Sequence, residues 1–510
     1  MNIAVFFILF FFVISVLIGI QAKKGKEMNL EQWSVGGRGM GTLLIFLLSA
    51  GEMYTTFTFL GASGSAYGEG GSIFSIVSYG CLATVISYWT FPAIWRYAKK
   101  HRLVSQSDFF VKKYQSPYLG VLVAVIGVIA CTCYLVLQLK GLGYIVSATS
   151  YGAISSTAAI WVGAIGVTIF VMVSGINGSA RTAILKDILI LGIVVFLGVY
   201  FPLHYYGGIQ PMYEAIESAK PNYTILPDKG MSVSWYISTV ILSSIGFYMW
   251  PHGFSPIYAA SSEKALRKNA ILMPMYQLIL LFAFFVGFAA ILQTPGLKGS
   301  EADLILLQLS KQDFDPWFVG LIGGTGVLAA LVPSSMLLMS ISTLLAKNVY
   351  SVFTPSATEN QIAKLVKYLV PLISLVGIYL TFKGGNSLFS LALIAYNFIT
   401  QLAPAFFASL MRKNFVTKQG AFAGIITGGV LVSIMELGNI KIGQLFPYLP
   451  QAIKDLNVGI IALFVNIAVL VVVSLMTKNI TYTHKDNDVL ETKTVEHKVL
   501  IQKESNSQST

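Results

Sequence analysis

Long apolar runs separated by polar connections are the main feature of the sequence. A helix that crosses the hydrocarbon core of a bilayer needs about 20 apolar residues. Thirteen runs qualify and predict thirteen transmembrane helices, at approximately 2–20, 41–66, 71–94, 119–148, 155–177, 183–207, 233–251, 270–293, 317–347, 366–383, 387–411, 418–436 and 457–477. The pattern therefore predicts an all-α polytopic membrane protein. Its transmembrane domain is expected over residues 1–477, followed by a polar cytoplasmic tail over 478–510 that is expected to be disordered.

Composition and charge narrow the class of protein. Hydrophobic residues make up 55% of the 510 residues and charged residues only 11%. Soluble domains carry about 25% charged residues, so a soluble enzyme and a disordered chain are excluded. Most of the lysines and arginines behind the net charge of +12 fall in alternate connections and in the tail. Because positive charge marks the cytoplasmic side, this bias predicts an N-terminus outside and a C-terminus inside, and no nucleic-acid partner.

Polar residues inside apolar runs are candidate functional residues, because burying them in a membrane is costly. The run at 41–66 contains Ser49-Ala-Gly-Glu-Met-Tyr-Thr-Thr56. Gly51 loosens the helix, Glu52 supplies an acid, and the next three residues supply hydroxyls. An interrupted helix frees carbonyls that bind cations and N–H groups that bind anions. The segment therefore predicts an ion or solute site.

A second polar interruption lies in the run at 233–251. It reads Ser243-Ser-Ile-Gly246, followed by Phe247-Tyr-Met-Trp-Pro-His252. Interrupted helices at matching places in two halves of a chain indicate an inverted repeat, with the binding site between the halves. We interpret His252 as an interface or gate residue because it lies near the predicted cytoplasmic end.

Two charged residues allow two interpretations each. Lys140 in the fourth run either pairs with Glu52 or faces a solute cavity and binds a carboxylate. Asp187 either forms an interfacial ion pair with Arg181 or Lys186, or lies on the path by which an ion leaves.

The ninth run contains Pro333-Ser334-Ser335. Proline removes a hydrogen bond from the helical ladder and frees a carbonyl. Hydroxyls beside freed carbonyls offer oxygen ligands without a full charge, which suits sodium. This segment is therefore the second candidate for an ion site.

These motifs together resemble the sodium:solute symporter family, which includes sodium/proline, sodium/galactose and sodium/pantothenate carriers. The resemblance rests on the order and spacing of the apolar runs and of these segments: Val35-Gly-Gly-Arg38, Ser49-Ala-Gly51, Leu60-Gly-Ala-Ser-Gly-Ser-Ala-Tyr67, the serines of the ninth run and Asn348-Val-Tyr350. Within the family, the chain is most similar to the monocarboxylate permease branch, through Gly51-Glu-Met-Tyr-Thr-Thr-Phe-Thr-Phe59, Gln138-Leu-Lys-Gly141 and Met249-Trp-Pro-His-Gly253.

The resemblance implies a LeuT-like core in which helices 2–6 and 7–11 are inverted repeats. It also implies a sodium site made by the carbonyls of Gly51 and Tyr54 and the hydroxyls of Thr55, Ser334 and Ser335. The candidate solute-binding residues are Glu52, Thr56, Gln138, Lys140 and Ser243. Asp187 is the candidate for the ion exit path.

The expected function is sodium-coupled symport of a small organic solute, such as a monocarboxylate, by alternating access across the plasma membrane. Proton coupling and an amino acid or vitamin substrate stay open as alternatives, as does a transporter-like solute sensor. Sodium is expected only as the coupling ion. We expect no other cofactor, no catalytic residues and no obligate protein partner.

Overall fold

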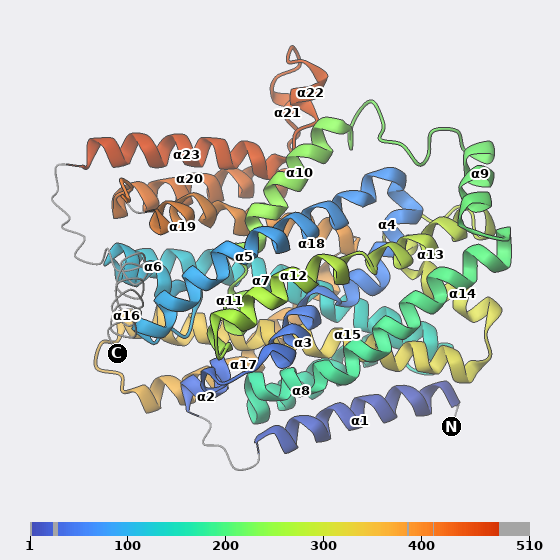
Figure 1. Cartoon of the computed structure of the whole chain (residues 1–510), viewed down its shortest axis with the longest axis horizontal. Coiled ribbons are helices and arrows are strands. Elements are labelled where there is room, and N and C mark those ends of the chain that lie inside the picture. The colour runs from blue at the N-terminus through green and yellow to red at the C-terminus, as the bar shows by residue number, and fades with distance from the viewer. Residues whose placement is uncertain (1–2, 24–28, 385–386, 412, 479–510) are drawn as a thin grey trace, which may run out of the picture.

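The computed structural model describes residues 3–23, 29–384, 387–411 and 413–478. Helices form most of this part of the chain, and they pack lengthwise against one another (Figure 1). The tail expected over 478–510 lies outside the described residues, apart from Lys478.

The helices follow one another through three sections of the chain. The first section contains α1 (Ile3–Lys23), α2 (Leu30–Val35), α3 (Thr42–Met53), α4 (Ala62–Glu69), α5 (Ser75–His101), α6 (Gln106–Tyr114), α7 (Pro117–Thr149) and α8 (Ser156–Tyr206). The second contains α9 (Ile209–Ala219), α10 (Val233–Gly246), α11 (Pro251–Ala259), α12 (Glu263–Gln277), α13 (Leu280–Gln293), α14 (Ile305–Asp313), α15 (Pro316–Thr343), α16 (Ser351–Phe353), α17 (Glu359–Lys383), α18 (Leu388–Ile399) and α19 (Ala403–Leu410). The third contains α20 (Lys418–Leu437), α21 (Ile442–Leu445), α22 (Gln451–Lys454) and α23 (Val458–Met476).

The predicted all-α membrane architecture is confirmed, whereas the predicted number of spans is not. Ten helices of the described chain are long and apolar enough to cross a membrane, or eleven if the bent pair α10 and α11 counts as one span. Every predicted run lies on a helix. The count differs because two runs, 155–177 and 183–207, fall within α8, and because α3 has only 12 residues.

A single glycine breaks the longest helix. The 51 residues of α8 would extend about 77 Å as a straight helix, more than twice the hydrocarbon thickness of a bilayer. Gly175 has non-helical angles of φ 52° and ψ −150°. The carbonyl of Val171 instead accepts a hydrogen bond from the Trp33 indole nitrogen at 3.1 Å. The short helix α2 is therefore fixed against the break in α8.

Both predicted helix interruptions are present. α3 ends at Met53, and the chain continues helically only from the π-helical segment Phe57–Gly61 into α4. α10 passes through a short 3₁₀ turn, Phe247–Met249, and bends by 55° into α11. These two breaks begin the two halves that were predicted to be inverted repeats.

The outer layer of the bundle encloses a central helix. Every residue in the most apolar stretch of the span that contains α15 is buried, although α15 contains glycines, serines and Pro333. α1 lies along one side of the bundle, and the paired helices α20 and α23 lie along the opposite side (Figure 1). The broken helices lie between these layers, where their freed backbone groups are shielded from lipid.

Backbone hydrogen bonds connect the starting end of α3 to the finishing end of α11. Met40 N donates to Ala259 O at 3.0 Å, and Ser261 N donates to Met40 O at 2.9 Å. This short β-bridge between Met40 and Ala260 ties together one half of each broken helix.

The connection between α13 and α15 covers the far end of α4. The Tyr67 hydroxyl donates to Thr294 O at 2.6 Å and accepts from Leu297 N at 3.1 Å. At Gly64, an added Cβ would lie 2.8 Å from the carbonyl oxygen of Ala302. The backbones therefore approach as closely as a glycine allows, and this side of the bundle is tightly packed.

Replacing Gly175 with alanine is expected to destabilise the protein. An alanine would adopt a backbone conformation that favours glycine, and its Cβ would lie 2.6 Å from the Trp33 carbonyl oxygen. We expect a loss of about 1–3 kcal/mol, seen as a lower midpoint of thermal unfolding in detergent. Gly192→Ala on the same helix is the control, because nothing lies within 4 Å of its added Cβ. Equal midpoints for the two variants would contradict this account of the break.

Candidate functional site

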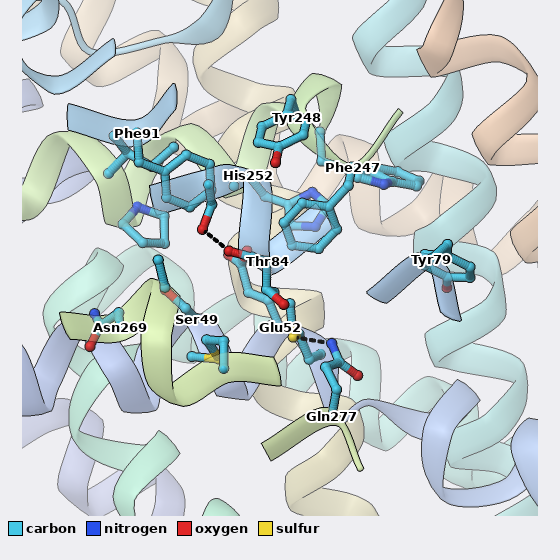
Figure 2. A pocket seen from close by; sticks show the side chains of 18 of the residues that line it. Ser49, Glu52, Tyr79, Thr84, Phe91, Phe247, Tyr248, His252, Asn269 and Gln277 are labelled. Atoms are coloured by element: carbon cyan, nitrogen blue, oxygen red, sulfur yellow. Dashed lines mark hydrogen bonds between the residues drawn. The ribbon is translucent and has the colours of Figure 1, made fainter. Parts of the chain in front are cut away.

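A cavity of about 120 Å³ lies beside the two helix breaks. α3, α5, α7, α11, α12 and α18 all contribute to its wall (Figure 2). The wall is mainly aromatic and aliphatic, with a few polar side chains placed among them. Such a lining, with a small number of fixed polar groups, is typical of small-molecule sites.

Asn269 on α12 is the most conspicuous polar group of the wall. Its side chain is 5% exposed, and neither its amide nitrogen nor its amide oxygen has a hydrogen-bond partner in the described chain. An unsatisfied buried amide costs free energy. A ligand in the cavity could satisfy both groups, which makes Asn269 a candidate binding residue.

Glu52 and His252 are the residues of the wall whose side chains can carry a charge near neutral pH. Glu52 lies in the last turn of α3, and one of its carboxylate oxygens is buried without a hydrogen bond in the described chain. His252 lies in the first turn of α11, 5% exposed, with its Nδ1 3.8 Å from the Cys131 sulfur. The structure places His252 on the cavity wall, and its interpretation as an interface or gate residue stays a prediction.

The carbonyls predicted to bind sodium have a different partner in the structure. Lys186 Nζ donates to Gly51 O and to Tyr54 O, each at 2.8 Å. Lys186 extends from α8 and is 0% exposed. The predicted sodium carbonyls thus converge on one point, and a lysine ammonium lies at that point.

The break in α3 explains why these carbonyls are available. In an intact helix Gly51 O would accept from Thr55 N. Thr55 N instead donates to the Thr58 hydroxyl at 2.7 Å, and Phe57 N donates to the Thr55 hydroxyl at 3.1 Å. The threonines therefore satisfy the N–H groups of the break and leave its carbonyls to another donor.

The predicted hydroxyl ligands are buried but make other bonds. Ser335 Oγ lies 2.6 Å from Ser179 Oγ and donates to Val332 O at 2.6 Å. Thr55 Oγ1 lies 3.3 Å from the Tyr134 hydroxyl. Ser334 is 1% exposed on α15. The role of these hydroxyls as sodium ligands stays a prediction.

Two of the predicted solute-binding residues contact each other. The hydroxyl and the backbone N–H of Thr56 both donate to Gln138 Oε1, at 2.7 and 3.2 Å. Ser243 is fully buried on α10, and its hydroxyl has no hydrogen-bond partner among the described residues. None of these three lies among the residues that line the cavity, whereas Glu52 does.

Lys140 lies away from the cavity wall and next to the outer connection. It is 7% exposed, interacts electrostatically with Asp303, and places its ammonium 5.7 Å from the Tyr144 ring centre. Glu52 interacts electrostatically with Lys186. The structure therefore does not form the predicted pair between Lys140 and Glu52.

Asp187 forms one of the two ion pairs weighed for it, but not at an interface. Its carboxylate lies 3.0 Å from Lys186 Nζ, and the side chain is only 4% exposed. Both residues had been expected in a cytoplasmic connection, whereas they lie in the interior on α8. The role of Asp187 in ion exit stays a prediction.

Sequence reasoning missed Lys186 and Asn269 as site residues. Lys186 lies near the start of the run at 183–207 and was counted with Arg181 among the cytoplasmic positive charges, so it resembled an interfacial cation. Asn269 directly precedes the run at 270–293 and resembled the polar end of a helix. An available signal was the adjacent pair Lys186-Asp187, since two opposite charges together lower the cost of burial.

Comparison with known proteins identifies the family. The model of the sodium:solute symporter family matches residues 33–428. The chain belongs to this family. Family membership supports sodium-coupled symport of a solute, so the chain is a transporter and not an enzyme. With its long apolar helices it is a multi-pass protein of the plasma membrane.

Individual members of the sodium:solute symporter family align over nearly the whole chain. The uncharacterized symporter YhjB of Bacillus subtilis strain 168 is 61% identical over 94% of this chain and 98% of its own length. A monocarboxylate transport permease protein of Rhizobium johnstonii is 26% identical over 91% of this chain and 95% of its own length. The solved structure of a Na⁺-coupled sialic acid symporter aligns over 94% of this chain and 98% of the symporter's own chain, with a TM-score of 0.76 at 16% identity. This likeness confirms the LeuT-like fold.

The buried carboxyl beside Lys140 should make stability depend on pH. Burial raises the pKa of Asp303 to about 6 from its ordinary 3.8, although Leu388 N and Lys140 oppose the rise. Between these values the folded protein holds a proton that the unfolded chain releases, so stability falls as pH rises through about 4 to 6. Asp303→Asn should remove this contribution, at most about 3 kcal/mol.

The measurement is thermal unfolding of both proteins in detergent at several pH values from 4 to 7. The difference in midpoint between variant and wild type should move in favour of the variant as pH rises. A constant difference would mean that the pKa of Asp303 is not raised. Asp228→Asn, in the connection before α10, is the control.

Proposed function

We propose that the protein takes up a small monocarboxylate-type anion together with a cation, by alternating access. The observation that carries the proposal is the cavity beside the two helix breaks, with the first turn of α11 and the amide of Asn269 on its wall. A mainly apolar cavity of about 120 Å³ favours a small organic solute.

The donors on the cavity wall favour an anion. His252 lies in the first turn of α11, where backbone N–H groups have no acceptor within the helix, whereas Gly253 N already donates to Trp250 O at 3.1 Å. The N-terminal end of a helix carries partial positive charge and binds carboxylates in broken-helix transporters. The residues that line the cavity include no lysine or arginine, so a carboxylate would bind through these neutral donors.

The residues around the helix breaks support the monocarboxylate class over the other solutes considered. The similarity to the monocarboxylate transport permease extends over 91% of this chain.

On the predicted orientation α3 and α11 are the cytoplasmic halves of the broken helices, because the connection before α3 carries Arg38. The cavity would then lie on the cytoplasmic side of the breaks, while the connection over α4 closes the outer side.

Uptake by purified protein in proteoliposomes tests the proposal. Labelled lactate, pyruvate, acetate, proline and pantothenate would be offered under an inward sodium gradient, with potassium and pH gradients as comparisons. We expect accumulation of a monocarboxylate. Accumulation of proline or pantothenate alone would overturn the solute class, and accumulation driven only by the pH gradient would overturn sodium as the coupling ion.

Asn269→Ala should weaken solute binding. The variant removes a buried donor and acceptor from the cavity wall, and one lost hydrogen bond of about 1.4 kcal/mol raises KM about tenfold. The rate at saturating solute should change less, because the interaction is made with the bound solute throughout. The measurement is the concentration dependence of initial uptake.

Gln419→Ala is the matched control for this variant. Its amide oxygen is also buried without a hydrogen bond in the described chain, but Gln419 lies on α20, away from the cavity. An equal rise of KM in both variants would show that Asn269 acts through stability and not through the solute.

A further inference from the structure

The oxygen atoms predicted to hold sodium already surround a positive charge of the protein itself. Three acceptors face Lys186 Nζ: Gly51 O at 2.8 Å, Tyr54 O at 2.8 Å and an Asp187 carboxylate oxygen at 3.0 Å. An ammonium has three N–H donors and no acceptor. The two carbonyls accept hydrogen bonds from the ammonium, whereas the Asp187 carboxylate contacts it as an ion pair and neither of its oxygens has a hydrogen bond in the described chain. The positive charge at this position is therefore balanced by the protein itself.

Side chains of α8 and α15 pack against the end of α3 beside these carbonyls. An added Cβ on Gly51 would lie 3.4 Å from Ala183, 3.4 Å from Lys186 Nζ and 3.5 Å from Val332. α8 and α15 thus close around the end of α3. A sodium ion that used the same two carbonyls would also lie beside the ammonium, where two like charges with little screening repel strongly.

The hydroxyl side of the predicted sodium site is consistent with this arrangement. Ser335 Oγ is bonded to Ser179 on α8 and to Val332 within its own helix. These bonds join α8 and α15 beside the lysine and supply no oxygen to the carbonyl pair. The residues present at this position therefore fit an internal ammonium and do not fit a sodium ion.

We propose that Lys186 is a built-in cation that occupies the predicted sodium position, so that this position does not take sodium while the lysine is there. Sodium coupling in this family member then requires a different position in the chain. The inference concerns the ion site of the proposed symport, but it does not depend on which solute is carried.

The test is sodium binding to purified protein in detergent, without any solute. Equilibrium binding of radioactive sodium would be compared between wild type and Lys186→Ala, in potassium-balanced buffer. Removal of the ammonium frees two carbonyls and the Asp187 carboxylate, so we expect the variant to bind about one more sodium ion per protein than wild type. Equal binding by the two folded proteins would overturn the proposal.

Lys140→Ala is the matched control, because Lys140 is a second buried lysine that lies away from these carbonyls. Its sodium binding should equal that of wild type, and a gain there would show that any lost buried lysine suffices. If none of the labelled solutes were taken up by proteoliposomes, this sodium-binding result would not change. The two proposals are therefore tested separately.

A second measurement avoids the variant altogether, in case Lys186→Ala does not fold. An experimental map of the wild-type protein in saturating sodium chloride should show the lysine side chain between Gly51 O and Tyr54 O. An ion at that point with Lys186 turned away would overturn the proposal.

Discussion

The free carbonyls at the end of α3 impose the main constraint on the centre of the structure. Inside a membrane bundle a backbone oxygen without a donor costs several kcal/mol, because no water replaces the lost helical bond. The break at Tyr54 frees such oxygens at Gly51 and Tyr54, and the threonines around it bond to neither of these two. Lys186 supplies the missing donors, and Asp187 offsets its charge. α3, α8 and α15 are held together at this point.

The two breaks present opposite polarity to the middle of the bundle. The finishing end of α3 offers carbonyls and Glu52, which favour a positive group. The starting end of α11 carries the partial positive charge of a helix N-terminus at His252, which favours a negative group. The cavity lies between them, with the unpartnered amide of Asn269 on its wall (Figure 2). The two sides of the centre therefore differ in polarity.

The fold followed from the sequence because it depends on properties that a single chain displays. Apolar runs of bilayer length predicted the helices, and the polar residues around Gly51 and Gly246 predicted both interruptions. The polar segment at the first break predicted freed carbonyls, and the resemblance to the family assigned them to Gly51 and Tyr54. The number of spans was not confirmed, because the separate runs at 155–177 and 183–207 form one helix, α8, that is kinked at Gly175.

The site was only partly predictable because it depends on which residues meet across the bundle. Lys186 lies 132 positions from Tyr54 in sequence, and no local pattern shows that the two touch. The count of positive charges assigned Lys186 to the cytoplasmic side of the membrane. That count uses the place of a charge along the sequence and not how deeply its side chain is buried in the bundle. Lys140 was assigned to the site for a similar reason, as a charge inside a run, although its partner is Asp303 in the outer connection.

The β-bridge between Met40 and Ala260 has a mechanical consequence. It joins α3, which carries the carbonyls bonded to Lys186, to α11, whose first turn lies on the cavity wall. Tilting one of these half-helices alone would break two backbone hydrogen bonds, each worth about 1 kcal/mol. The two half-helices therefore tend to move as one rigid body, so that a change of occupancy at one end of the centre affects the other end.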